Sequence, residues 1–125
     1  MKIASDLDNV LAFNNKDRAL FRPFKMHQFY AQCHAGHLCR IHWNYVVTGR
    51  KQCYRKITEK WLRKNNIQYG ELVMFKIGLK KTLKSLCKYK SDMINRFDIE
   101  IYYEDDIKIA EYLRQNCSGT KIVVV

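Results

Sequence analysis

The chain has 125 residues, enough for one compact domain and too few for two ordinary ones. Hydrophobic residues make up 47% of the sequence and charged residues 28%, a balance that excludes an intrinsically disordered chain. The formal net charge is +11, from 23 lysines and arginines against 12 aspartates and glutamates. Such a charge favours an anionic partner or substrate, and a basic surface that only aids solubility is the alternative.

No apolar run approaches the roughly 20 residues that a membrane-spanning helix needs, so no membrane partner is expected. The first residues lead directly into an apolar segment, without the pattern of a signal peptide. The five cysteines are an odd number and include no pair with the spacing of a redox motif, which indicates free thiols in a reducing compartment. We therefore expect a cytoplasmic protein whose single domain spans residues 1–125.

A short apolar run over residues 2–6 ends at two carboxylates and predicts a buried strand. Asp6 and Asp8 are two residues apart, so in extended chain their side chains point the same way while Leu7 points to the opposite face. Two like charges held this close repel each other unless a cation or a shared proton lies between them. The pair therefore indicates a metal or catalytic site, and a strand that simply ends in an Asx-type turn is the alternative.

The next elements are predicted to be a helix, a strand and a second helix. Pro23 is a start signal for a helix over residues 24–34, which Gly36 ends. An apolar strand over residues 41–47 ends at Thr48, and an amphipathic helix over residues 51–65 follows.

Cysteine and histidine side chains are concentrated between the first predicted helix and the second strand. The residues are Cys33, His34, His37, Cys39 and His42. Sulfur and imidazole are zinc ligands, but this spacing matches no established zinc pairing, and the segment runs from a helix end into a strand. A structural role is favoured, and zinc binding through Cys33, His37, Cys39 and His42 is the alternative.

The second half of the chain continues the alternation of strands and helices. Strands are predicted over residues 72–77, 99–103 and 121–125, and helices over residues 79–86, 90–95 and 107–115. Lys80, Lys81, Lys84 and Lys88 form a basic stripe, which is either a solvated face or an electrostatic track for phosphates. The last strand is uninterruptedly apolar, which suits a strand buried on both faces.

This alternation predicts an α/β fold, a Rossmann-like three-layer sandwich with a mostly parallel five-stranded sheet. In such sheets ligands bind beyond the carboxyl ends of the strands, near a switch in strand order. Five polar side chains follow predicted strand ends: Asp6, Asp8, Thr48, Asp105 and Asp106. We expect them to converge at one edge of the sheet.

Four short motifs occur at these positions in a fixed order. Asp6-Leu7-Asp8-Asn9-Val10 ends the first predicted strand and Thr48-Gly49-Arg50 the second, while Tyr89-Lys90-Ser91-Asp92 precedes the fourth and Glu104-Asp105-Asp106 ends it. In this order they resemble the haloacid dehalogenase-like (HAD) phosphohydrolase superfamily over about residues 3–113. Asn9 departs from the pattern, because the family often has glycine there.

The resemblance implies a role for each matching residue. Asp6 is the expected nucleophile, which forms an aspartyl-phosphate, and Asp8 the general acid/base. Thr48 is expected to donate a hydrogen bond to the transferring phosphoryl group. Lys90 is the expected active-site lysine, with Lys88 as the alternative.

The resemblance also implies Mg²⁺ as cofactor. The expected metal ligands are Asp6, the backbone carbonyl of Asp8, Asp105 and Asp106, with a register uncertain by one residue because Glu104 is also acidic. Mg²⁺ prefers oxygen ligands, and its charge offsets the repulsion between a carboxylate nucleophile and an anionic phosphate monoester.

The short spacing between the motifs leaves no room for a sizeable cap domain, so the resemblance implies a capless member with an open active site. Together with the net charge, an open site favours nucleotide or nucleic-acid phosphate ends as substrates, with sugar phosphates and phosphoproteins as further alternatives. The expected function is a Mg²⁺-dependent phosphomonoesterase. A non-catalytic nucleic-acid-binding module on the same fold is the alternative.

Overall fold

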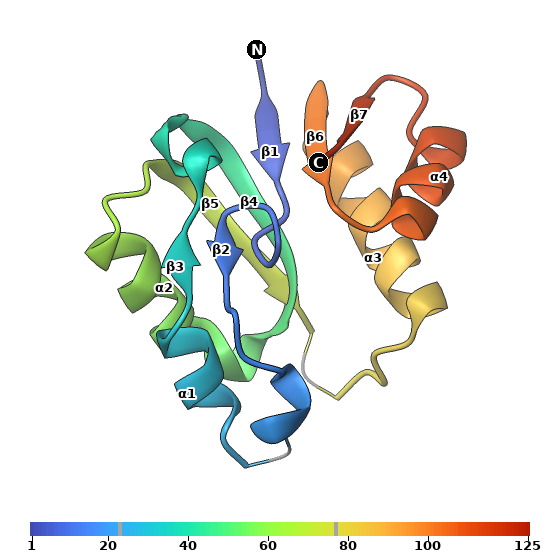
Figure 1. The fold of residues 1–125 in the computed structure, drawn as a ribbon. Coiled ribbons are helices and arrows are strands. Elements are labelled where there is room, and N and C mark those ends of the chain that lie inside the picture. The colour runs from blue at the N-terminus through green and yellow to red at the C-terminus, as the bar shows by residue number, and fades with distance from the viewer. Residues whose placement is uncertain (23, 77) are drawn as a thin grey trace.

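The computed structural model describes residues 1–22, 24–76 and 78–125. Five parallel strands form its central sheet in the order β5-β4-β1-β6-β7 (Figure 1). The strands are β1 (Ile3–Ser5), β4 (Trp43–Lys51), β5 (Tyr69–Phe75), β6 (Ile101–Glu104) and β7 (Lys121–Val124). The predicted α/β fold with a five-stranded parallel sheet is confirmed.

Helices cover both faces of the sheet (Figure 1). The helices are α1 (Met26–Ala31), α2 (Arg55–Lys64), α3 (Leu83–Arg96) and α4 (Ile107–Asn116). Val46 packs in a core with Trp61 of α2, whereas Val47, on the opposite face, packs in a core with Ile94 of α3 and Leu113 of α4. The central strand β1 is apolar on both faces because each face meets a helical layer. The last strand, β7, is predicted to be buried on both faces but lies at the edge of the sheet, where Val124 is exposed. Within the described ranges, no helix combines the length and apolarity that crossing a membrane requires.

The segment between β1 and β4 differs from its prediction. It contains a two-stranded antiparallel sheet, β2 (Ala12–Phe13) with β3 (His34–Ala35), the 3-10 turns η1 (Arg18–Leu20) and η2 (His37–Arg40), and α1. Helix α1 is shorter than the predicted helix over residues 24–34, because the chain leaves the helix to pair His34 with Phe13. Two-residue strands are too short to give a period of two, so the sequence pattern does not predict them. Pro23 lies outside the described residues.

Helix α3 corrects the prediction of two separate helices over residues 79–86 and 90–95. One continuous helix runs from Leu83 to Arg96. It starts at a capping box in which Thr82 Oγ1 accepts from Ser85 N–H and Ser85 Oγ accepts from Thr82 N–H. No glycine or proline interrupts the chain from Thr82 to Arg96, so the helix continues past Lys90.

The bounds of the strands, and of α2 against the predicted helix over residues 51–65, also differ from those predicted. The predicted strand over residues 41–47 is β4, which continues to Lys51, and its register with β5 becomes irregular between Val47 and Lys51. Strand β5 begins at Tyr69, earlier than the predicted strand over residues 72–77, and residue 77 lies outside the described part of the chain.

We expect Thr82→Ala to lower the free energy of unfolding by about 1 kcal/mol, because the first turn of α3 loses its side-chain acceptor. Lys84→Ala is the matched control, since Lys84 is exposed in the same turn and has no capping role. Urea unfolding of both variants measures the difference. Equal stabilities of the two variants would contradict the role of the capping box.

Candidate active site

The site lies where the strand order reverses. From β1 the chain passes to β4 and β5 on one side of the sheet, and then to β6 and β7 on the other (Figure 1). Ser5 pairs with Tyr103, and the N–H of Asp6 donates to the carbonyl of Tyr103 over 3.0 Å. The next residue on each strand, Asp6 and Glu104, therefore lie side by side at the carboxyl edge, where parallel sheets bind ligands.

Three carboxylates and one ammonium group form the centre of the site. Asp6, Glu104 and Asp105 each offer an oxygen, and these atoms lie within 4.8 Å of one another. Lys90 Nζ lies 3.0 Å from Asp6 Oδ2 and 2.7 Å from Glu104 Oε1. Both Lys90 and Glu104 are almost completely buried, at 1% and 0% exposure. The structure thus brings together Asp6, Lys90 and Asp105, as expected, and adds Glu104.

Glu104 is fixed by hydrogen bonds on both of its oxygens. Its Oε1 accepts from Lys90 and, at 3.4 Å, from the hydroxyl of Tyr102, while its Oε2 accepts from the backbone N–H groups of Asp105 (3.1 Å) and Asp106 (3.2 Å). Glu104 therefore holds both the lysine and the turn after β6. Its place can be inferred from strand alternation, because residue 104 shares the inward face with Tyr102.

The electrostatics of the centre favour a bound cation. Burial raises the pKa of Asp6 to about 7; Lys90 lowers that pKa, while Glu104 and Asp8 raise it. Burial alone would lower the pKa of Lys90, but the carboxylates of Asp6 and Glu104 raise it above its ordinary value. Burial also raises the pKa of Asp105.

When Asp6, Glu104 and Asp105 are all ionised, the three carboxylates against one ammonium group leave an excess of two negative charges. The donor atoms on the open side of the cluster are all oxygens, and the excess equals the charge of one divalent cation. A hard ion such as Mg²⁺ therefore fits the residues present.

Asp8 forms a second charged group with Arg50. Arg50 Nε lies 3.0 Å from Asp8 Oδ2 and Arg50 Nη2 lies 2.7 Å from Oδ1, a bidentate pair, and Arg18 Nη2 lies 3.7 Å from Oδ2. The side chain of Arg50 is 0% exposed, donates to Thr58 Oγ1 and lies 3.9 Å from the centre of the Tyr30 ring. These contacts fix the orientation of Asp8. The sequence pattern places Arg50 in the motif Thr48-Gly49-Arg50 without indicating a role for it; its position just beyond Thr48 and Gly49, at the end of an apolar strand, is the signal that could have indicated one.

The remaining predicted residues lie around this centre. Thr48 is completely buried, and its hydroxyl accepts from the N–H of Arg50 at 3.1 Å, so it stabilises the backbone that presents Gly49 to the site. Asp106 caps α4, because its Oδ1 accepts from the N–H groups of residues 108 and 109. Lys88 is exposed and pairs with Asp92 at 3.3 Å, on the surface of α3.

The turn after β1 explains why asparagine is tolerated at position 9. Asn9 has a φ of 63°, in the left-handed region, and its N–H donates to the carbonyl of Ala12 at 2.8 Å. Asparagine is among the few residues other than glycine that adopt this conformation readily. Asparagine at this position therefore keeps the turn that presents Asp8.

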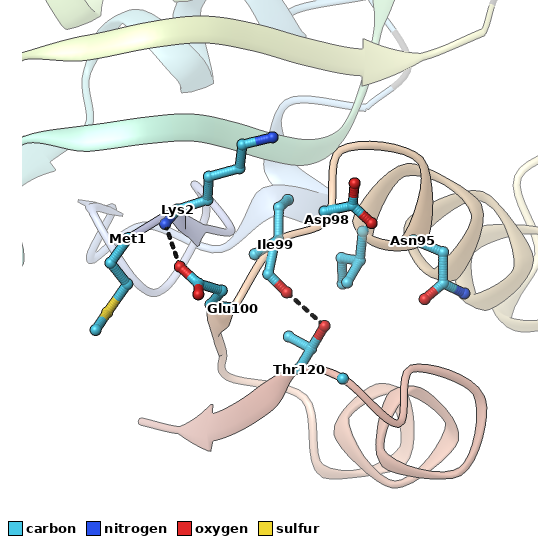
Figure 2. Close-up of a pocket in the computed structure, with 9 residues that line it drawn as sticks. Met1, Lys2, Asn95, Asp98, Ile99, Glu100 and Thr120 are labelled. Carbon is cyan, nitrogen blue, oxygen red and sulfur yellow. Dashed lines mark hydrogen bonds between the residues drawn. The ribbon is translucent and has the colours of Figure 1, made fainter.

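A small hollow opens above the carboxylates, with a volume of about 150 Å³. Arg18 and Lys81 line it together with the acidic residues. These two cationic side chains form the rim of the hollow around its acidic centre. Another hollow, of about 540 Å³, lies at the opposite, amino-terminal edge of the sheet. Figure 2 shows two hydrogen bonds among its lining residues: Thr120 donates to the carbonyl of Ile99 at 2.6 Å, and the N–H of Lys2 donates to Glu100. It has no cluster of chemically reactive groups.

The zinc alternative receives no support from the geometry. Within the part of the chain that the structure describes, the group of Asp6, Glu104 and Asp105 is the only set of three or more potential metal-binding side chains. Cys33 Sγ and Cys39 Sγ instead donate to the carbonyls of Phe29 and Leu11. Both hydrogen bonds lie within the segment between β1 and β4, so these cysteines stabilise the local structure of that segment.

Comparison with known proteins identifies neighbours in fold. The sequence matches no known protein family and no curated protein. Two solved structures of the Pnkp1/Rnl/Hen1 RNA repair complex contain a chain of similar fold, with TM-scores of 0.77 and 0.78 and 18% sequence identity. The alignments cover 99% of this chain but 42% and 45% of those chains, so this chain spans less than half their length. At this identity the likeness shows the shared fold.

We expect Asp8→Ala to destabilise the protein more than Arg50→Met does. Without Asp8 a completely buried guanidinium loses its counter-charge, which costs about 3–5 kcal/mol in comparable pairs. Without Arg50 the Asp8 carboxylate, whose side chain is 21% exposed, keeps contact with water and Arg18. Urea unfolding measures both changes.

Asp92→Ala is the control for this comparison, because it removes an aspartate from an exposed ion pair, which is worth at most about 1 kcal/mol. The expected difference between the two variants would be contradicted if Asp8→Ala lost no more free energy of unfolding than the control. It would also be contradicted if Arg50→Met lost more than Asp8→Ala.

Proposed function

We propose that this chain is a HAD-like, Mg²⁺-dependent phosphomonoesterase that acts on nucleotide or nucleic-acid phosphate ends. The observation that carries the proposal is the buried contact of Lys90 with Asp6 and Glu104 beside Asp105, at the carboxyl edge of a parallel sheet. Burying a lysine together with carboxylates has a desolvation cost, and buried charged groups with strongly shifted pKa values are concentrated at functional sites. The fold neighbours from an RNA repair complex support the nucleic-acid part of the proposal.

Asp6 is the proposed nucleophile. Lys90 holds its Oδ2 and the N–H of Leu7 donates to its Oδ1 over 2.7 Å, so the carboxylate has one defined orientation. An Asp6 oxygen attacks the phosphorus and forms an aspartyl-phosphate while the bond to the leaving oxygen breaks. Mg²⁺, held by Asp6, Asp105 and the backbone carbonyl of Asp8, would supply charge neutralisation for the anionic phosphoryl group.

Asp8 is the proposed general acid and base. The first step uses the protonated form of Asp8, whose proton goes to the leaving oxygen. In the second step the resulting carboxylate takes a proton from the water that attacks the aspartyl-phosphate, and phosphate is released from Asp6. Arg50 positions the Asp8 carboxylate through its bidentate contact. Thr48 acts through the backbone, where its hydroxyl fixes the N–H of Arg50.

We expect Asp6→Asn to lower phosphate release about a thousandfold or more, because an amide cannot form the aspartyl-phosphate. The assay measures Mg²⁺-dependent phosphate release from an aryl phosphate, mononucleotides, and oligonucleotides with 3′- or 5′-phosphates. Asp92→Asn is the matched control, since it makes the same chemical change at an exposed position on α3. Equal activity of Asp6→Asn and the parent protein would refute the proposed nucleophile.

We expect Mg²⁺ to raise the melting temperature of the parent protein, because the cation offsets the excess negative charge of the folded site. At ten times its Kd, a ligand that binds the folded state alone stabilises it by about 1.4 kcal/mol. Asp105→Asn should reduce this shift, whereas Asp92→Asn should leave it unchanged. Differential scanning calorimetry with and without Mg²⁺ measures it. A shift as large in Asp105→Asn as in the parent would argue against the proposed ligand set.

A non-catalytic nucleic-acid-binding module is the second candidate. The net charge of +11 and the cations Arg18 and Lys81 at the rim favour it. Binding to a polyanion alone, however, does not require the buried contacts among Asp6, Lys90 and Glu104. This candidate predicts salt-sensitive oligonucleotide binding that survives Asp6→Asn, with no phosphate release from the parent protein.

A further inference from the structure

A basic and aromatic groove opens from the rim of the carboxylate hollow. It has a volume of about 400 Å³ and shares Arg18 and Lys81 with that hollow. Its lining residues are Arg18, Arg22, Met26, Tyr30, Lys51, Tyr54 and Lys81. Among these described residues there are four cations and no acidic side chain, so the groove attracts anions all along its length.

The size of the carboxylate hollow requires that most of a substrate lies outside it. A volume of about 150 Å³ is equivalent to about five water molecules in the liquid. A phosphoryl group and a hydrated ion take up this space, so the remainder of the substrate must leave over the rim. The volume of the adjoining groove falls within the range of about 300–1,000 Å³ that is usual for ligand sites.

A second exit from the rim is less suited to a polyanion. This hollow, of about 340 Å³, is lined by Lys16 and Arg18 but also by the carboxylate of Asp8 and by the uncharged Asn9, Asn14, Phe29 and Cys33. A chain of phosphates that took this path would pass Asp8 and meet two cations, whereas the basic groove offers four. Charge therefore favours the basic groove.

Aromatic rings extend the groove toward the surface. Arg50 stacks on Tyr30, the rings of Tyr30 and Tyr54 are 5.1 Å apart, and those of Tyr54 and His27 are 4.9 Å apart. Tyr30 is buried, Tyr54 is half-buried and His27 is exposed, so the series runs from the partner of Asp8 out to solvent. Cations along a backbone path with aromatic rings beside it are the combination that binds single-stranded nucleic acid.

We propose that this groove binds the nucleotides that flank the terminal phosphate of a single-stranded nucleic-acid end, so that oligonucleotides are preferred to mononucleotides. The inference deepens the proposed function and rests on it for the position of the reacting phosphate. Arg22 and Lys51 contact phosphodiester groups beyond the rim, and Tyr54 lies against a base.

The test compares Arg22→Gln/Lys51→Gln with the control Arg63→Gln/Lys64→Gln. Each double variant removes one arginine and one lysine, and the control pair is exposed in the last turn of α2, outside the groove. The four side chains lie on the surface or at its edge, and thermal melting verifies that both variants fold. One readout is the ratio of kcat/KM for a terminally phosphorylated octanucleotide to that for an aryl phosphate. The other is the Kd of a fluorescent octanucleotide with hydroxyl ends, measured by anisotropy over a salt series.

We expect the groove variant to lower the kcat/KM ratio about tenfold, and to reduce the dependence of log K on log salt by roughly 1.4, the value for two lost phosphate contacts on a single strand. The control should retain the ratio and the slope of the parent. The binding readout needs no catalysis, so if the parent releases no phosphate the proposed function fails while the anisotropy still decides about the groove.

The proposal would be overturned if the groove variant and the control lost octanucleotide affinity and the kcat/KM ratio to the same extent, since that would indicate binding to diffuse surface charge. An unchanged preference for the octanucleotide in the groove variant would also overturn it. So would turnover of a phosphopeptide with the same dependence on Arg22 and Lys51, which would assign the groove to a protein substrate.

Discussion

The contact of Lys90 with Asp6 and Glu104 is the constraint on which the site depends. Removing an ammonium group from water costs several kcal/mol unless carboxylates compensate for it, and here two carboxylates lie at 2.7 and 3.0 Å. Lys90 lies on α3, Asp6 directly follows β1 and Glu104 ends β6, so the contact forms only when the helix packs across two adjacent strands. The hydrophobic core beneath α3 and the charged centre of the site are therefore assembled together, with Ile94 and Lys90 on the same helix.

Charge is arranged in two zones from the sheet outward. The inner zone, Asp6, Glu104 and Asp105 against Lys90, has an excess of negative charge and suits a divalent cation. The outer zone, Asp8 against Arg50 and Arg18, has an excess of positive charge and suits an anion. Because the zones meet at the turn between Asp6 and Asp8, a cation and a phosphoryl group would be held next to each other with complementary charge.

The segment between β1 and β4 contributes to the site although it is short. Its 3-10 turn carries Arg18, and its helix carries Tyr30 against the guanidinium of Arg50. This segment thus supports the outer zone and one wall of the basic groove. None of this follows from its sequence pattern, because the two-residue strands and single turns that fold it back have no periodicity to detect.

The sequence by itself determined the alternation of strands and helices and the positions of the acidic strand ends. Uninterrupted apolar runs and turn-forming residues are local signals, so the five strands and the carboxylates Asp6 and Asp105 at their ends could be located without a structure. The tertiary structure alone decided which partner each polar side chain of the site has. Glu104 joins Asp6 at Lys90, and Asp106, expected as a metal ligand, caps α4. Thr48 accepts from the backbone, and Arg50 pairs with Asp8. Those choices depend on which side chains meet across strands far apart in the sequence, and on how much water packing leaves around each charge, and neither quantity is encoded locally.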